Sequence, residues 1–344
     1  MNMIKPPKLT KGDMIAIISP SAGLAGLFPH RLENAKIALE KLGFKIKIFP
    51  RTKTVLDWSS GLPKERAEDL HDAFLNKNVK AIICSIGGLV SNQLLPFINF
   101  NIIKKNPKIF CGYSDITILH YAFFTQIQLV TFYGPAALTQ FGEYPKPLDY
   151  TLKYFLKALA TSKPVGKIIP SLKWTDEVLD WSKKDDLKRP RQLKENKGFE
   201  WLKEGSAKGQ IIGGCLPSIL QLKGTKYWIN HKNKIFFIEI PEGQDFMKAY
   251  SLEYVDSNLT DLELSGIFEQ INGLVVGRPY RYTLQEEEKF KKIILRHTEA
   301  YSFPILYSID IGHSDPMITI PLGTEVKLDS NSNSFIFLES GTSE

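Results

Sequence analysis

The chain has 344 residues, which is enough for about two domains of ordinary size with a sizeable core. Hydrophobic residues make up 43% and charged residues 24%, values near the average of soluble globular proteins, so disordered, collagen-like and repeat chains are excluded. The formal net charge is +7, and Lys and Arg outnumber Asp and Glu most densely at 183–203. That segment is either a solvated basic loop or a surface that faces an anionic ligand.

Three cysteines, Cys84, Cys111 and Cys215, are far apart, and each lies in an apolar stretch. This is typical of reduced core cysteines rather than of a disulfide framework. The apolar stretch 14–28 is interrupted by Ser-Pro-Ser, falls short of the roughly 20 residues of a spanning helix and lacks the layout of a signal peptide. We therefore expect a cytoplasmic protein with no membrane partner.

The first 165 residues alternate short β-rich apolar runs with amphipathic helical stretches, a pattern typical of a parallel sheet covered by helices. Helices are expected from Pro29 and Pro63, because proline is favoured at the first helical position and apolar residues then recur on one face. Five apolar runs predict strands, at 14–20, 45–49, 79–85, 108–112 and 129–133. The prediction for 1–165 is a doubly wound, flavodoxin-like α/β domain, whose ligands gather beyond the carboxyl ends of the strands.

Residues 166–208 break this rhythm and are expected to form a linker and active-site loop. Loops this long are usually functional or disordered, and the tryptophans Trp174, Trp181 and Trp201 argue against plain disorder. A smaller mixed α/β domain rich in β structure is expected over 209–344. Its predicted strands lie at 211–214, 234–240, 271–277, 303–309, 317–320 and 334–339.

The segment 109–120 carries the sharpest signal of chemistry. A buried-looking strand ends there in Gly-Tyr-Ser-Asp, whose serine is Ser114, and passes directly into a helix. A serine at such a turn projects its hydroxyl above the sheet edge, as in a nucleophile elbow, although Gly-x-Ser-x-Gly is absent. An ordinary helix cap is the competing interpretation. The pair Gly87-Gly88 is likewise either a tight turn or an anion-binding nest of backbone N–H groups.

A serine hydroxyl is a weak nucleophile unless a base takes its proton. Among six histidines His313 is the best placed, because it follows an apolar run on a strand-end loop, although a plain surface loop also explains it. His120 is expected in the core, and the other four lie in charged contexts that suggest the periphery. Glu239 interrupts an apolar strand, where it is either a buried, paired carboxylate or an outward-facing residue.

Two common kinds of site are not indicated. The sequence contains no phosphate loop ending in Gly-Lys-Ser/Thr, no His-Glu-x-x-His and no cysteine pair at zinc spacing, so we expect no metal and no organic cofactor. The positive net charge suggests nucleic acid as a partner, but no basic stripe with interleaved aromatic residues lies on a known motif. Nucleic-acid binding is therefore not expected.

Several blocks together resemble the LD-carboxypeptidase family of serine peptidases, nearly end to end. They are SPSAG (19–23), SIGGLVSNQLLPFIN (85–99), GYSDIT (112–117), FYGPA (132–136), GGCLPSILQLKGTKY (213–227), FFIEI (236–240), GLVVG (273–277) and IDIGHSDPMITIPLG (309–323). The resemblance implies a triad of Ser114 as nucleophile, His313 as base and Glu239 as orienting carboxylate. It also implies an oxyanion hole from the backbone N–H groups of Gly87-Gly88 and Asp115.

The resemblance extends to the substrate. Murein-cleaving members carry an arginine before the glycine pair where this chain has Ile86, and 173–181 with Asn196 resembles the loop of the microcin C immunity peptidases. That branch implies a peptidyl- or aminoacyl-nucleotide substrate, with Trp174 and Trp181 either contacting it or merely docking the loop. It also implies a homodimer. The alternatives are a murein tetrapeptide LD-carboxypeptidase and a non-catalytic peptide- or nucleotide-binding module.

Overall fold

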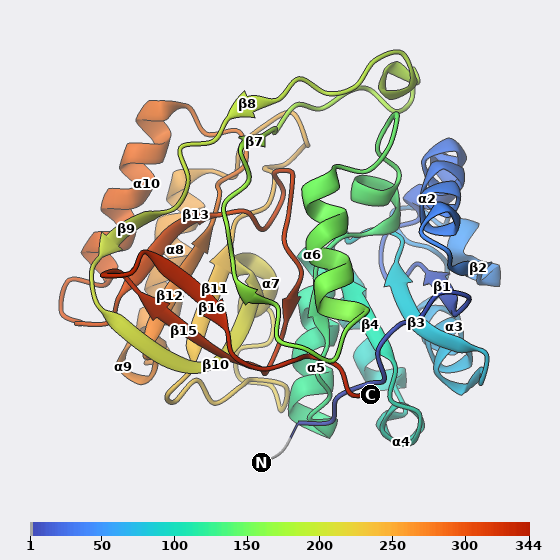
Figure 1. Ribbon diagram of the computed structural model, residues 1–344, viewed down its shortest axis with the longest axis horizontal. Coiled ribbons are helices and arrows are strands. Elements are labelled where there is room, and N and C mark those ends of the chain that lie inside the picture. Colours follow the sequence, from blue (N-terminus) through green and yellow to red (C-terminus); the bar gives the residue numbers. More distant parts are fainter. Residues whose placement is uncertain (1–2) are drawn as a thin grey trace.

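A six-stranded sheet forms the N-terminal half of the computed structural model, which describes residues 3–344 (Figure 1). Strands β2, β1, β3, β4 and β5 are parallel and adjacent in that order, which is the flavodoxin-like doubly wound order that the sequence predicts. The strands are β1 (Met14–Ile18), β2 (Lys45–Ile48), β3 (Val79–Cys84), β4 (Ile109–Gly112), β5 (Phe132–Tyr133) and, antiparallel at the edge, β14 (Ile320–Pro321).

Helices cover both faces of this sheet because each buries one apolar face. Helix α2 begins at Pro29 and buries Leu32, Ala35 and Leu39, whereas α3 begins at Pro63, as expected. The helical elements are α1 (Leu24–Leu27), α2 (Pro29–Lys41), η1 (Pro50–Lys53), α3 (Pro63–Leu75), η2 (Ser91–Phe97), α4 (Phe100–Lys105), η3 (Ser114–Ile116), α5 (Thr117–Ile127), the π-helix η4 (Ala137–Phe141) and α6 (Asp149–Leu159).

The C-terminal part is a mixed sheet of eight strands, in the order β6-β16-β15-β10-β11-β12-β13-β9. Its centre, β10 to β13, is parallel, and antiparallel strands extend it on both sides. The strands are β6 (Gly166–Lys167), β9 (Glu200–Lys203), β10 (Ser206–Cys215), β11 (Ile235–Glu239), β12 (Gly273–Gly277), β13 (Ile305–Ile309), β15 (Glu325–Asp329) and β16 (Ser334–Phe337). The helices are α7 (Leu216–Leu220), α8 (Leu252–Leu264), α9 (Ile267–Gln270) and α10 (Leu284–His297).

The middle segment, predicted as a linker and active-site loop, contains short strands. Strands β6 and β9 belong to the C-terminal sheet, and between them the chain forms the small ribbon β7 (Lys173–Trp174) and β8 (Lys194–Glu195) and the turn η5 (Asp185–Leu187). Figure 1 shows this segment arching across the top of the molecule from one sheet to the other. The segment therefore bridges the two halves.

A second difference concerns 317–320, which was predicted as a strand of the C-terminal domain. Only Ile320 is in a strand, and that strand, β14, pairs with β5 of the N-terminal sheet. After the His313 loop the chain returns over α6, where Met317 N–H donates to Thr151 Oγ1. An apolar run predicts burial, but it does not tell which sheet buries it.

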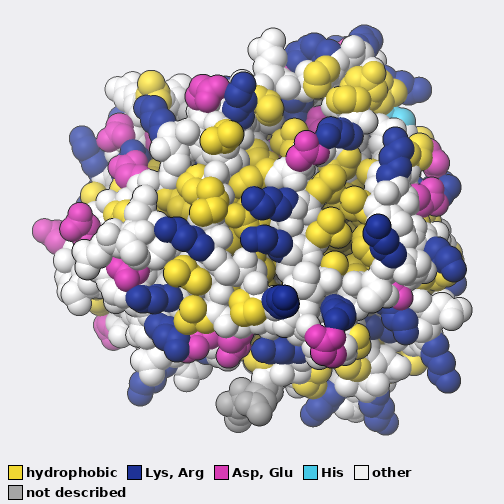
Figure 2. All heavy atoms as spheres, viewed as in Figure 1, with side chains coloured by type: hydrophobic (Ala, Val, Ile, Leu, Met, Phe, Trp, Pro, Cys, Tyr) yellow, Lys and Arg dark blue, Asp and Glu magenta, His cyan; other side chains and the backbone are white. Residues whose placement is uncertain are grey.

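One hydrophobic core runs through both sheets, and a second lies under α3, α4 and α5. Cys84, Cys111 and Cys215 are buried and free, as the sequence predicts. Within residues 3–344 no helix is long and apolar enough to cross a membrane. On the face shown in Figure 2, Lys and Arg side chains are scattered widely, which is consistent with the positive net charge.

Candidate active site

Ser114 lies where β4 turns into η3 and α5. Its φ of +63° is in the left-handed region, which a non-glycine residue rarely adopts and which nucleophile elbows use. Two hydrogen bonds hold the turn, since Ser114 N–H donates to the Tyr133 hydroxyl at 2.9 Å and Thr117 Oγ1 donates to the Ser114 carbonyl at 2.6 Å. At the starts of η3 and α5 the described residues form no side-chain cap, so capping does not explain the Ser114 side chain.

His313 and Glu239 meet Ser114 although they come from the C-terminal half of the chain. His313 Nε2 is 2.9 Å from Ser114 Oγ, and His313 Nδ1 is 2.8 Å from Glu239 Oε2. Glu239, at the end of β11, is fully buried, which answers the question that its sequence pattern left open. The three side chains form a continuous hydrogen-bonded chain of hydroxyl, imidazole and carboxylate, the arrangement found in Ser-His-Asp triads.

The space around Glu239 is built from small residues. A Cβ added to Gly312 would lie 2.7 Å from Glu239 Oε2, and one added to Gly277 would lie 2.9 Å from Glu239 Cβ. The second carboxylate oxygen, Oε1, accepts a hydrogen bond from the Tyr133 hydroxyl at 2.6 Å. Tyr133 therefore joins the backbone of Ser114 to the carboxylate that holds His313.

The charges around His313 shift its pKa. Burial of the imidazole lowers the pKa, but the carboxylates of Glu239 and Glu242 outweigh burial and raise it to about 9. Glu242 contributes because its Oε2 is 3.2 Å from His313 Nε2. The two carboxylates therefore favour the protonated form of the imidazole.

Gly87, one of the predicted oxyanion residues, lies next to both Ser114 and Asp115. A Cβ on Gly87 would lie 3.1 Å from Ser114 Oγ and 3.3 Å from the backbone nitrogen of Asp115, so the Gly87 backbone passes close to the Ser114 hydroxyl. Gly88 has φ +147°, and a Cβ there would lie 2.5 Å from Ser21 Oγ. The Asp115 side chain is buried and accepts hydrogen bonds from Ser21 Oγ and Ser91 N–H.

A cavity of about 350 Å³ opens above Ser114 and His313. Trp181 lines it, with the guanidinium of Arg31 4.5 Å from the ring centroid and Phe28 edge-on at 5.5 Å. Trp174 does not line this cavity. Its ring packs instead with two cations, Arg278 at 4.9 Å and Lys194 at 4.8 Å, so its geometry is that of a docking residue.

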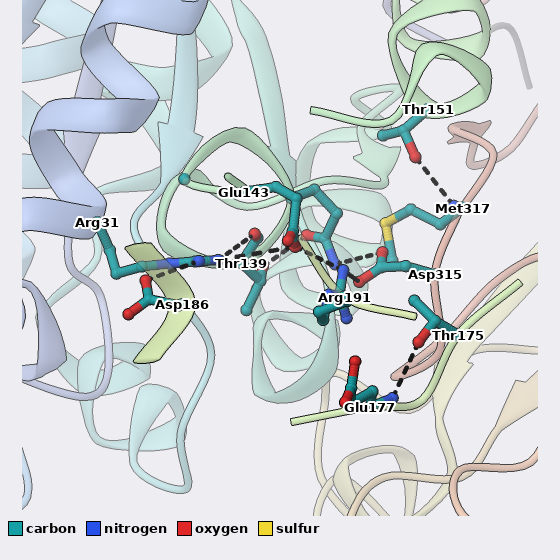
Figure 3. A network of polar contacts seen from close by, with 12 residues as sticks. Arg31, Thr139, Glu143, Thr151, Thr175, Glu177, Asp186, Arg191, Asp315 and Met317 are labelled. Carbon is teal, nitrogen blue, oxygen red and sulfur yellow. Dashed lines mark hydrogen bonds and ion pairs between the residues drawn. The ribbon is translucent and has the colours of Figure 1, made fainter. Parts of the chain in front are cut away.

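Arg191 fixes the bridging segment to the site. Its Nη2 atom is 2.6 Å from Glu143 and 2.7 Å from Asp315, and both carboxylates are nearly buried (Figure 3). Asp315 lies two residues after His313, and its backbone pairs with that of Thr175 in both directions. Figure 3 shows the ion pair of Arg31 and Asp186 at the left, separated from Asp315 by Thr139 and Glu143.

Two further predictions concern histidines. His120 is buried in the core between Thr131 Oγ1 and the Gly112 carbonyl, as predicted. His231, predicted at the periphery, is instead 1% exposed, because its ring packs edge-on against Trp228 and Phe236. Within the described residues, no three His, Cys, Asp or Glu side chains are grouped as a metal site would require.

Sequence reasoning missed three residues that shape the site, namely Tyr133, Arg191 and Glu242. Tyr133 lies inside the FYGPA block, so the block marked its importance but not its role. The other two had only weak signals: Arg191 belongs to the basic segment, and Glu242 follows Glu239 by three residues.

Two domain models of one family match this chain. The LD-carboxypeptidase N-terminal domain matches residues 15–134, and the LD-carboxypeptidase C-terminal domain matches residues 208–328. These ranges contain Ser114, Glu239 and His313, and together they span more than half of the chain. The chain belongs to the LD-carboxypeptidase family, a family of carboxypeptidases.

Relatives that match over nearly their whole length show the same family membership. YocD of Bacillus subtilis, which is named as a carboxypeptidase, is 34% identical over 94% of this chain and 95% of its own length. The microcin C7 self-immunity protein MccF of Escherichia coli is 31% identical over 96% of this chain and 94% of its own length. A Bacillus subtilis protein named as a murein peptide carboxypeptidase is 28% identical over 99% and 96%, respectively.

Solved structures of MccF match the whole fold. MccF in complex with aspartyl sulfamoyl adenosine has a TM-score of 0.91 at 28% identity, and the match covers 99% of this chain and 100% of that one. MccF in complex with glutamyl sulfamoyl guanosine also has a TM-score of 0.91, covering 98% and 99%.

Proposed function

We propose that this protein is a serine peptidase that hydrolyses an amide bond in a small peptide-like substrate. The observation that supports it is the continuous hydrogen-bonded chain Ser114 Oγ–His313–Glu239 at the floor of the cavity. Such a chain activates a hydroxyl that is otherwise a weak nucleophile.

In the acylation step Ser114 Oγ attacks the scissile carbonyl carbon while His313 Nε2 takes the hydroxyl proton. The C–N bond then breaks, and the leaving nitrogen receives that proton from His313. In deacylation a water molecule attacks the ester, His313 takes its proton, and the proton returns to Ser114 Oγ as the carboxylic acid leaves. Glu239 stays ionised and stabilises the imidazolium.

The backbone N–H groups of Gly88 or Gly87 and of Asp115 are proposed to hold the oxyanion. The close approach of the Gly87 backbone to Ser114 Oγ and the Asp115 nitrogen supports this assignment. Each such donor typically contributes about 10²- to 10³-fold to kcat.

As substrate we propose a peptidyl- or aminoacyl-nucleotide. MccF, which shares the fold over its whole length, is solved with aminoacyl sulfamoyl nucleosides. Trp181 lines the cavity with one cation against its ring, which is compatible with stacking of a nucleobase on the indole. Ile86, which stands where murein-cleaving members have arginine, also lines the cavity.

Product analysis by mass spectrometry tests the proposal with purified protein, its Ser114→Ala variant, an alanyl sulfamoyl adenosine and an L,D-tetrapeptide of murein. We expect the wild type to cleave the nucleoside compound and the variant to cleave neither. Cleavage of the tetrapeptide alone would select a murein carboxypeptidase instead. If neither compound is cut while one raises the melting temperature of both proteins equally, a binding module is the better account.

A further inference from the structure

Glu242 points its carboxylate at the imidazole that activates Ser114. Its Oε2 is 3.2 Å from His313 Nε2, the same nitrogen that lies 2.9 Å from Ser114 Oγ. The loop that carries it is fixed, since Glu242 bridges to Ala249, Gly243 N–H donates to the Lys248 carbonyl, and the Tyr280 hydroxyl donates to the Phe246 carbonyl. The Glu242 side chain is 41% exposed and lines the cavity.

Glu242 differs from the other charged residues of the cavity in its partners. Arg191 is paired with Glu143 and Asp315, Arg31 with Asp186, Arg189 with Glu177, and Lys183 with Asp180. In the part of the chain that the structure describes, no Lys or Arg forms an ion pair with Glu242, and its one cationic partner is His313. A negative charge beside the nucleophile is therefore available to a ligand.

Acidic side chains also dominate the lining as a whole, although the protein is basic. The carboxylates are Glu143, Glu177, Asp180, Asp186, Glu242 and Asp315, against the guanidinium groups of Arg31 and Arg191. This contrasts with the Lys- and Arg-rich face shown in Figure 2. Arg189 and Lys183 offset two of these carboxylates, and Arg31 and Arg191 offset Glu143, Asp186 and Asp315. Among the described lining residues, Glu242 is therefore the carboxylate without a Lys or Arg partner, and it is the one that favours a cationic group on the substrate.

The position of Glu242 indicates which cationic group it meets. When the scissile carbonyl carbon of an aminoacyl substrate lies at Ser114 Oγ, it is bonded to the carbonyl oxygen, the leaving nitrogen and the α-carbon. The α-amino group is only one bond beyond that α-carbon, and the Glu242 carboxylate is 3.2 Å from the imidazole nitrogen that contacts Ser114 Oγ. We propose that Glu242 is a specificity-determining residue that binds the free α-ammonium of an aminoacyl substrate, so that aminoacyl compounds are preferred over their N-acylated counterparts. This inference rests on the proposed peptidase function and narrows its substrate class.

The contact of Glu242 with His313 also affects the pKa of His313, the proposed base. The groups that face His313 are Glu239 at the end of β11, Glu242 on the loop after it, Asp315 on the His313 loop, and Tyr113 and Ser114 after β4. Glu242 helps to hold the pKa of His313 near 9 in the free protein. An ammonium bound to Glu242 offsets its charge, which lowers the pKa of His313 and increases the share of neutral base at neutral pH.

Kinetics with two substrates that differ only at this group test the inference. The pair is alanyl sulfamoyl adenosine and its N-acetyl derivative, measured with wild type, Glu242→Gln and, as control, Glu204→Gln, an exposed carboxylate on the turn between β9 and β10. At pH 7 we expect the wild type and the control to favour the free amine about 10- to 100-fold in kcat/KM, the effect of one charge-assisted contact. Glu242→Gln should lose this preference.

Two pH readouts separate a contact with substrate from a structural effect. The wild-type preference should fall as the pH rises above about 8, where the α-ammonium loses its proton. For the N-acetyl substrate, Glu242→Gln should shift the rise of kcat/KM with pH to lower pH, because one of the charges that raise the pKa of His313 is gone.

The outcomes distinguish the inference from the function on which it rests. Equal kcat/KM for both substrates in the wild type, or an undiminished preference in Glu242→Gln, would overturn the role of Glu242 while leaving the peptidase intact. If the wild type cleaves neither compound, the proposed nucleotide substrate fails, and the inference fails with it. Thermal melting of Glu242→Gln near that of wild type verifies that its fold is retained.

Discussion

At the scale of single residues, Tyr133 is the side chain that joins the parts of the proposed triad. Its hydroxyl accepts from Ser114 N–H at 2.9 Å and donates to Glu239 Oε1 at 2.6 Å, and the residue is fully buried. It therefore holds both the left-handed turn at Ser114 and the orientation of the carboxylate. It does not touch the reacting atoms, so we regard it as a positioning residue.

Replacing Tyr133 with Phe should lower kcat by about 10- to 100-fold with little change in KM, because a buried carboxylate oxygen and a buried N–H lose their partner. The matched control is Tyr121→Phe. Tyr121 is equally buried, and within the described residues its hydroxyl has no hydrogen-bond partner. Steady-state kinetics on both variants test this, and equal kcat in Tyr133→Phe and wild type would contradict the positioning role.

The elevated pKa of His313 predicts the pH dependence of the activity. Because only the neutral imidazole can take the proton of Ser114, kcat/KM for an N-acylated substrate should rise with pH up to about 9. A plateau reached already below pH 7 would show that the imidazole is not held protonated by its carboxylates.

The raised pKa of His313 also makes the stability of the folded protein depend on pH. The folded-state pKa of about 9 lies above the ordinary value of 6.5, so protonation favours the folded state. This contribution is complete below about pH 6.5 and is lost as the pH rises through about 9. Melting temperatures of wild type and His313→Gln should therefore differ in their dependence on pH over that window.

At the scale of elements, the segment from β6 to β9 is fixed to the site by Arg191. Removing this cation would leave the nearly buried carboxylates of Glu143 and Asp315 without their common partner, which typically costs about 3 to 5 kcal/mol. We expect Arg191→Leu to lower the melting temperature by several degrees and to reduce kcat, since Asp315 lies two residues from His313. Arg189→Leu, which removes an exposed ion pair with Glu177, should leave the melting temperature nearly unchanged.

The elements also show what apolar patterns can predict. The parallel strands β1 to β4 and the helices after Pro29 and Pro63 follow from short apolar runs and helix-start signals. Strand β15, which lies between β10 and β16, was missed because its residues alternate between buried and half-buried positions, and β9 was missed because it lies in a charged segment. The pairing of β14 with β5 depends on where the chain returns in space, which no local pattern contains.

At the scale of the whole molecule, the site exists only because two sheets meet. Ser114 and His313 are 199 residues apart in sequence. Considered alone, Ser114 could be an ordinary helix cap and His313 an ordinary surface-loop residue. Their grouping therefore came from the family resemblance and not from composition or periodicity. The roles of Arg191 and Glu242 could not be predicted in either way, because they depend on contacts between segments that are distant in sequence.

The assembly of the molecule stays a prediction, as do the domain boundaries at 165 and 209. Strand β14 crosses from the C-terminal part into the N-terminal sheet, and β6 and β9 join the middle segment to the C-terminal sheet. For the expected homodimer, light scattering should give about twice the chain mass. A solution mass of 39.0 kDa would contradict it.

The central claim is that Ser114 is the nucleophile of an amide hydrolase, and covalent trapping tests it most directly. We would treat the protein with an activated phosphonate, a reagent that phosphonylates serines made nucleophilic by a neighbouring base, and locate the adduct by peptide mass spectrometry. The account predicts a single adduct on Ser114 that is lost in His313→Ala and Ser114→Ala and is suppressed by alanyl sulfamoyl adenosine. An unmodified Ser114, or modification that persists without His313, would contradict it.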